Sequence, residues 1–246
     1  LHHSRHSFPT RRSSDLVSRG LHLRTPLIVY NGVYLLDPDS HDILYSHSFT
    51  RQDAQDILNY LLRHDMIPFV YSYIDGRERV SYMEEGMHEG GKYYMESRPY
   101  DKRFRKVDTT EQLLEGDVFY FTCIHDGSFL KPMYEYLEET TDYVIVFQQE
   151  LYREEYWLEV MPRGVSKAQA ILELKEKGGY DRVISFGDAI NDLPMFQISD
   201  ECYAVGNAIE ELKNTATAVI GDHDADAVAM WLKENYQKKA GGSASV

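Results

Sequence analysis

The sequence predicts an α/β fold, in which a parallel-sheet core is joined to a region of α+β character. Two strand-to-helix patterns in the last third of the chain indicate the core: VISF (183–186), which leads through a turn into PMFQIS (194–199), and YAVGNA (203–208). Strand pairs interleaved with helices in the middle of the chain are typical of an antiparallel sheet with helices on one face. At 246 residues, the chain can form one large domain or two small ones.

The first predicted elements surround two turns. PLIVY (26–30) reads as a strand, and Asn31-Gly32 after it has turn composition. DILYSHSF (42–49) alternates like the returning strand of a hairpin. The turn before it contains Asp37 and Asp39 on either side of a proline, a favourable β-turn composition.

The middle of the chain predicts alternating helices and strand pairs. Thr50 and Asp53 form a capping box before an amphipathic helix, and Asp75-Gly76 favours a hairpin turn between 67–74 and 77–82. Residues 83–107 follow no pattern that we can assign. The remaining elements expected before residue 162 are a short helix at 109–116, a strand at 117–124, a helix at 128–139, and a hairpin of 143–149 with 155–161.

A helix is predicted between Ser166, which can cap its start, and Gly178-Gly179, which ends it. Lys167 then lies in the first turn. Because helix N-termini favour acidic residues, a lysine there is locally misplaced unless it has an anionic partner. The alternative interpretation is an ordinary surface lysine.

The loop after VISF carries the strongest functional signal. Gly187 allows a tight turn, and Asp188, Asn191 and Asp192 follow at the carboxyl end of the predicted strand, where open α/β sheets bind ligands. Two carboxylates and a carboxamide suit a hard divalent cation and the phosphate that it accompanies. Alternatively, Asn191 or Asp192 could cap the helix that follows, but a cap needs one such residue and does not explain Asp188.

Composition points to a cytoplasmic enzyme. The net charge of −14 argues against nucleic-acid and membrane partners, because an acidic surface repels phosphate groups. Two cysteines exclude a disulfide scaffold, and no apolar run approaches the ~18 residues that span a bilayer.

GVSK (164–167), FGDAINDLPMF (186–196) and AVGNA (204–208), in this order, resemble the C-terminal half of a haloacid dehalogenase (HAD) superfamily phosphatase of the Cof-like branch. PLIVYNGVYLLDP (26–38) is similar to the family's strand that leads from the core into a large type II cap. The resemblance implies a doubly wound, Rossmann-like core, here incomplete, interrupted by an inserted α+β cap. The implied boundaries are 17–31 and 159–238 for the core, 32–158 for the cap and 239–246 for a flexible tail.

The resemblance also implies an activity: hydrolysis of a small phosphate ester, such as a sugar phosphate, through an aspartyl-phosphate intermediate with Mg²⁺ as cofactor. Asp188 would bind Mg²⁺, and Asp192 would bind it through water or orient Asp188. Asn191 would hydrogen-bond the phosphate. Lys167 would offset the charge repulsion between the nucleophile and the phosphoryl oxygens. Asn31 would touch phosphate or substrate, although Asn31-Gly32 could equally be a turn.

The family's nucleophile motif, D-x-D-G-[TV], has no counterpart in this sequence. Residues 1–16 read as a translated sequencing adapter, so we expect a non-native start on an N-terminally truncated, inactive chain. Asp37 and Asp39 resemble the motif superficially. However, Ser40 and His41 stand where Gly and Thr or Val are required, so we interpret both aspartates as turn residues.

Two alternatives to the phosphatase remain. A phosphosugar mutase of the same superfamily shares the core and the cap, and differs in passing the phosphoryl group to a sugar hydroxyl. A non-catalytic protein that binds a phosphorylated metabolite is the second alternative. In all three, the expected partner is a small phosphorylated metabolite, and the sequence does not indicate an oligomeric state.

Overall fold

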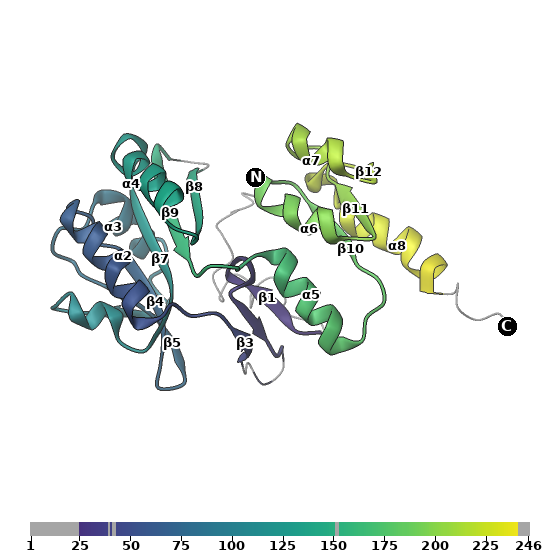
Figure 1. Ribbon diagram of the computed structural model, residues 1–246. Helices are drawn as coiled ribbons and strands as arrows, with labels where there is room; N and C mark the ends of the chain where they lie inside the picture. Colours follow the sequence, from purple (N-terminus) through teal and green to yellow (C-terminus); the bar gives the residue numbers. More distant parts are fainter. Residues whose placement is uncertain (1–24, 39, 41–42, 151–152, 241–246) are drawn as a thin grey trace. The chain divides into compact units, whose positions relative to one another are not determined.

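The structure, a computed structural model, describes residues 25–240 except 39, 41–42 and 151–152. The chain divides into two compact units, one running to Val165 and the other starting at Ser166 (Figure 1). The adapter-like segment 1–16, the stretch that follows it to residue 24, and residues 241–246 of the predicted tail lie outside the described residues.

The first unit begins with a three-stranded antiparallel meander of β1 (Leu27–Val29), β2 (Tyr34–Leu36) and β3 (Ile43–Ser46). The hairpin predicted before residue 50 is therefore confirmed. A 3₁₀ turn, η1 (Tyr30–Gly32), joins β1 to β2, and all three of its residues have positive φ angles, of 51°, 55° and 105°. The Asn31-Gly32 turn predicted from composition is thus present.

One strand pairing differs from expectation. We grouped residues 17–31 with the core, beside the strand at 183–186. Among the described residues, β1 instead pairs with β2, in antiparallel register from Leu27–Leu36 to Val29–Tyr34. The cause is local: the left-handed turn reverses the chain directly after Val29, so the nearest partner for β1 is the strand that follows it.

A six-stranded sheet in the order β6-β5-β4-β7-β9-β8 forms the centre of the first unit. The pairings are antiparallel except β5 with β6, which are parallel. Both predicted hairpins, β4–β5 and β8–β9, are confirmed, and Asp75 and Gly76 turn the first with φ angles of 48° and 72°. The strands are β4 (Phe69–Ile74), β5 (Arg77–Tyr82), β6 (Phe104–Lys106), β7 (Asp117–Asp126), β8 (Val144–Gln149) and β9 (Glu155–Met161).

Helices cover both faces of this sheet, whereas we expected them on one. Helices α2 (Arg51–Arg63) and α4 (Gly127–Thr140), with the 3₁₀ turn η2 (Glu111–Leu114), share a hydrophobic core with alternate strand residues such as Val70. Helix α3 (Glu89–Glu96) packs through Tyr94 on the other face, together with the meander. This helix lies in the stretch 83–107, which the sequence left unassigned.

A β-bulge interrupts β7. Tyr71 pairs with Tyr120 and Ser72 with Val118, so Phe119 is the extra residue. As a result, Phe119 and Tyr120 both join the second hydrophobic cluster, while Val118 and Phe121 belong to the first. The tyrosines gathered in this second cluster are buried, so the ordinary packing role of sheet tyrosines applies to them; they are Tyr30, Tyr34, Tyr71, Tyr82, Tyr94 and Tyr120.

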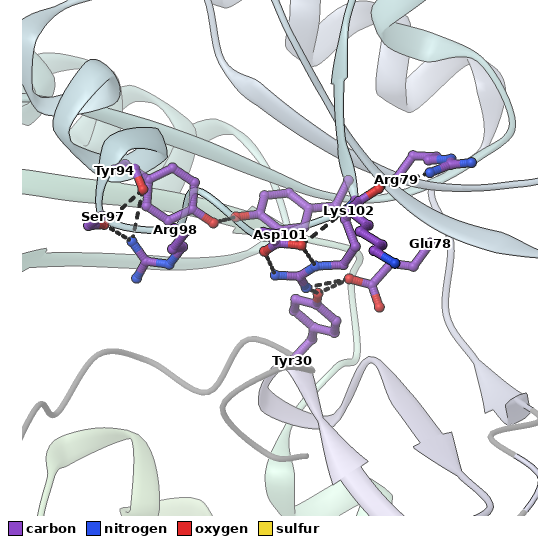
Figure 2. A network of polar contacts seen from close by, with 10 residues as sticks. Tyr30, Glu78, Arg79, Tyr94, Ser97, Arg98, Asp101 and Lys102 are labelled. Carbon is purple, nitrogen blue, oxygen red and sulfur yellow. Dashed lines mark hydrogen bonds and ion pairs between the residues drawn. The ribbon is translucent and has the colours of Figure 1, made fainter. Parts of the chain in front are cut away.

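A buried polar network ties the meander to the edge of the six-stranded sheet. Figure 2 shows Tyr30, Glu78 and Asp101 gathered around one guanidinium group, that of Arg103. Arg103 Nη1 donates to Tyr30 Oη at 2.6 Å and to Glu78 Oε1 at 2.5 Å, and the Tyr30 hydroxyl donates to the same glutamate oxygen. Burial raises the pKa of Tyr30 well above its ordinary value, so the phenol keeps its proton.

The second unit contains a three-stranded parallel sheet in the order β10-β11-β12, which confirms both core strands predicted from sequence. Its strands are β10 (Ile184–Gly187), β11 (Glu201–Ala204) and β12 (Ala218–Val219). Its helices and 3₁₀ turns are α5 (Lys167–Gly178), η3 (Ile190–Asp192), α6 (Leu193–Ile198), α7 (Glu210–Thr215), η4 (His223–Ala225) and α8 (Ala227–Ala240). Within the part of the chain that the structure describes, no helix is long and apolar enough to cross a membrane.

Candidate active site

The loop after β10 is held by contacts with the loop after β11. Because the two strands are parallel neighbours, their carboxyl ends lie at one edge of the sheet. The Val205 N–H donates to Gly187 O at 3.2 Å, and the Ile209 N–H donates to Asp188 O at 3.0 Å. The backbone that carries the acidic residues is therefore fixed on both sides of residue 188.

Asp192 folds back onto the start of this loop. Its Oδ2 accepts the backbone N–H groups of Asp188 at 3.1 Å and Ala189 at 3.3 Å. The close approach needs the glycine: a Cβ at Gly187 would lie 2.8 Å from the Asp192 Cβ and 2.9 Å from Oδ2. Asp192 thus stabilises the loop conformation. It stands at the N-cap position of α6, but its side chain makes no capping hydrogen bond to that helix, so the capping role that we considered for it is wrong.

Lys167 has the anionic partner that its position requires. Ser166 caps α5 by accepting the Gln169 N–H at 3.0 Å, and Gly179 ends the helix in the left-handed conformation, both as predicted. Lys167 Nζ donates to Asp192 Oδ1 at 2.5 Å. The side chain of Lys167 is 29% exposed and that of Asp192 is 7% exposed, so the pair is partly shielded from water. Lys167 is therefore not a free surface lysine.

Two side chains of the loop carry oxygen atoms that have no hydrogen-bond partner among the described residues. The Asp188 carboxylate is exposed and makes no hydrogen bond or ion pair with any described residue. Asn191 Oδ1 is buried and has no hydrogen-bond partner among the described residues. A buried amide oxygen without a partner costs free energy, and its burial here is accounted for if a ligand supplies the missing contact.

These donors fit Mg²⁺, because carboxylate and amide oxygens are what this hard cation prefers. Asp188 is the available anionic ligand. Asp192 is already occupied on both oxygens by Lys167 and the loop amides, which favours its orienting role over direct metal binding.

Asn31 belongs to the first unit. Its amide Nδ2 lies 4.0 Å from Met161 Sδ, and its φ of 55° places it at the centre of the η1 turn. Asparagine tolerates this left-handed conformation better than most residues do. Contact of Asn31 with phosphate or substrate stays a prediction. Asp37 also serves a turn, accepting the Ser40 N–H at 2.8 Å, while Asp39 lies outside the described residues.

Sequence reasoning missed the buried charges of the first unit. Burial raises the pKa of Glu159 to about 7, and its Oε2 makes no hydrogen bond among the described residues. The sequence of β9 could have indicated that Glu159 is buried. Glu159 stands between apolar residues, and both faces of this strand are covered. Arg103 lies in the unassigned stretch, so no pattern indicated its partners.

Comparison with known proteins shows the family to which the chain belongs. The chain belongs to the haloacid dehalogenase-like hydrolases, whose family model matches residues 9–232, and within them to the Cof-like branch. It is 23% identical over 218 residues to the pyridoxal phosphate phosphatase YbhA of Escherichia coli, a match covering 87% of this chain and 78% of YbhA.

Two solved structures share the fold. A haloacid dehalogenase-like hydrolase from Bacteroides thetaiotaomicron superposes with a TM-score of 0.75 at 20% identity, over 92% of this chain and 83% of that one. A sugar phosphatase of HAD subclass IIB superposes with a TM-score of 0.66 at 20% identity, over 90% and 78% of the two chains.

Proposed function

We propose that this chain is part of a Mg²⁺-dependent phosphatase that hydrolyses a small phosphorylated metabolite. One observation carries the proposal: the Asp192 carboxylate joins Lys167 to the loop amides, which leaves the Asp188 carboxylate and the Asn191 amide oxygen free at the strand ends. The cytoplasmic location inferred from composition remains a prediction.

Each residue then has a distinct role. Asp188 would hold Mg²⁺, which when bound neutralises charge that develops on the phosphoryl oxygens. Asn191 would position the phosphate. Lys167 would lower the repulsion between an incoming anionic nucleophile and the phosphate, and Asp192 would hold both Lys167 and the loop in place. The printed sequence contains no D-x-D-G-[TV] segment, so the nucleophile is assigned to none of its residues.

The test measures phosphate release by a full-length version that carries this motif, with Mg²⁺ and a panel containing pyridoxal phosphate and hexose phosphates. Asp188→Asn should abolish turnover, because the hard cation loses its anionic ligand. Asp181→Asn is the matched control, since Asp181 is an exposed carboxylate that precedes β10. Equal activity of the Asp188 and Asp181 variants would reject the site.

The alternatives predict different products from the same panel. A phosphosugar mutase would convert one hexose phosphate isomer into another with little release of phosphate. A non-catalytic binding protein would bind a phosphorylated metabolite and leave it unchanged, whether or not the motif is present.

A further inference from the structure

Two imidazoles and a carboxylate lie close together in the first unit. None of the three residues has a role in the proposed phosphatase site. His88 precedes α3, and His125 and Asp126 end β7. One ligand atom from each of the three lies within 4.8 Å of the others. Both histidines are half-buried and Asp126 is exposed, so water and ions reach the cluster.

Each imidazole is held in a defined orientation. His88 Nδ1 accepts the Gly90 N–H at 3.3 Å, which makes His88 the N-cap of α3. The His125 ring lies between two other rings, with centroids 3.7 Å from that of His88 and 4.0 Å from that of Phe129.

The close approach of α3 to β7 depends on a glycine. A Cβ at Gly90 would lie 2.7 Å from Ile124 Cγ2 and 3.1 Å from Glu155 Cγ, closer than side-chain carbons pack. With no side chain at Gly90, the helix start can settle against the sheet. His88 is thereby brought against His125.

The charges around the cluster favour a cation. Glu155 pairs across the sheet with Asp126 and adds negative charge, which Arg153 partly offsets through a hydrogen bond of 2.8 Å.

We propose that His88, His125 and Asp126 form a binding site for a zinc-type divalent cation. Two imidazole nitrogens with one carboxylate oxygen suit Zn²⁺, Co²⁺ or Ni²⁺, whereas Mg²⁺ prefers oxygen donors alone. The site is thus chemically distinct from the loop at Asp188, and it stands whether or not that loop binds Mg²⁺.

Binding requires the side chains to rotate. The Asp126 N–H donates to His125 Nδ1 at 2.7 Å and the Gly90 N–H donates to His88 Nδ1 at 3.3 Å, so Nε2 of each ring is the nitrogen left to bind an ion. Ligand atoms about 2.1 Å from a tetrahedral ion lie about 3.4 Å from one another, against the separation of up to 4.8 Å that the three side chains now have. Three protein ligands leave a fourth position for water. The bound ion would connect the start of α3 to the end of β7, two points 37 residues apart in the chain.

Isothermal titration of the full chain with Zn²⁺ tests the proposal. All variants carry His2→Ala, His3→Ala and His6→Ala, so that the N-terminal histidines cannot be the ligands. His88→Asn keeps a helix cap and His125→Phe keeps a stacked ring, so both retain the packing while removing a nitrogen ligand. We expect each to weaken Zn²⁺ binding at least tenfold and to lower the gain in Tm that Zn²⁺ produces.

Two controls separate this site from others. His64→Ala removes an exposed imidazole outside the cluster, and Asp188→Ala disables the proposed Mg²⁺ site; both should leave Zn²⁺ affinity unchanged. Ring ¹⁵N resonances of His88 and His125 should shift on Zn²⁺ addition, while that of His64 should not. Unchanged affinity in His88→Asn or His125→Phe, with circular dichroism showing a native fold, would overturn the proposal.

Discussion

Asp101 and Arg103, two residues apart in the chain, form a two-pronged ion pair inside the first unit. Arg103 Nε donates to Asp101 Oδ1 at 2.9 Å, and Nη2 donates to Oδ2 at 2.5 Å (Figure 2). The side chain of Arg103 is 10% exposed and that of Asp101 is 3% exposed. Since the same guanidinium also binds Glu78, one cation stabilises two buried carboxylates.

Arg103→Met should therefore destabilise the first unit strongly. Removing the cation leaves two carboxylates buried without compensation, a change that costs about 3–5 kcal/mol in the free energy of unfolding. Urea unfolding followed by Trp157 fluorescence measures it, in a Trp231→Phe background so that the signal comes from the first unit. Arg77→Met, an exposed arginine on β5, should change stability by less than about 0.5 kcal/mol. Equal effects of the two substitutions would contradict the prediction.

Lys167→Ala should lower kcat about 100-fold in the full-length enzyme, by analogy with the loss of one preorganised electrostatic donor. Steady-state kinetics with Mg²⁺ and the best substrate of the panel measures the effect. Lys175→Ala, on the same helix, serves as control because Lys175 pairs with Asp200 and not with the loop. A wild-type kcat in Lys167→Ala would show that the pair with Asp192 is structural alone.

Glu159 should make the stability of the first unit depend on pH. Burial raises its pKa to about 7, against about 4.5 for an exposed glutamate. Between these values the folded state binds a proton that the unfolded state has released. Stability is therefore highest below pH about 4.5 with respect to this group, falls as pH rises toward 7, and stays low above it, with a total change of up to about 3 kcal/mol.

Glu159→Gln should remove this dependence, because the amide cannot ionise. The variant should be more stable than the wild type at pH 8 and close to it at pH 5, as measured by urea unfolding at both values. Glu139→Gln, an exposed substitution on α4, should leave the wild-type pH dependence intact. If Glu159→Gln kept the full wild-type slope, the fall in stability would have to come from another group.

We expect the printed chain to release no phosphate from the substrate panel, because phosphoryl transfer needs an oxygen nucleophile held in line with the leaving group. Asp37 begins the segment that most resembles the motif, and its carboxylate accepts the Ser40 N–H in a turn. The assay compares the chain with a version carrying the D-x-D-G-[TV] segment. Turnover by the chain alone that Asp37→Ala abolishes would identify Asp37 as the nucleophile after all.

Elements with local signals could be predicted from the sequence. Thr50 accepts the Asp53 N–H at 3.1 Å, and Asp75-Gly76 forms the hairpin turn, because both depend on residues a few positions apart. Helix α3 could not be predicted. It has only eight residues, and two of its first three, Gly90 and Gly91, are poor helix formers. Its stability therefore depends on the cap at His88 and on packing against the sheet.

An anionic partner of Lys167 could be anticipated from the sequence, but the arrangement of the loop could not. Motif spacing indicated Lys167, Asp188, Asn191 and Asp192 together, and the position of Lys167 on its helix indicated an anionic partner. Which oxygen of Asp192 meets which group depends on the path of the loop, and no residue pattern encodes that path. The partner of β1 was missed for a similar reason, since strand pairing is set by tertiary contacts.

The bulge at Phe119 determines where the first unit can lose a residue. Deleting an ordinary strand residue shifts all later side chains to the opposite face of the sheet. At the bulge, the chain contains one residue more than pairing with β4 requires. A deletion there restores regular alternation and leaves the pairing of β7 with β9, which starts at Phe121, in place. The deletion would remove one buried ring from the core, while the other side chains of β7 would stay on their present faces of the sheet. Length variation in β7 is therefore tolerated best at this position.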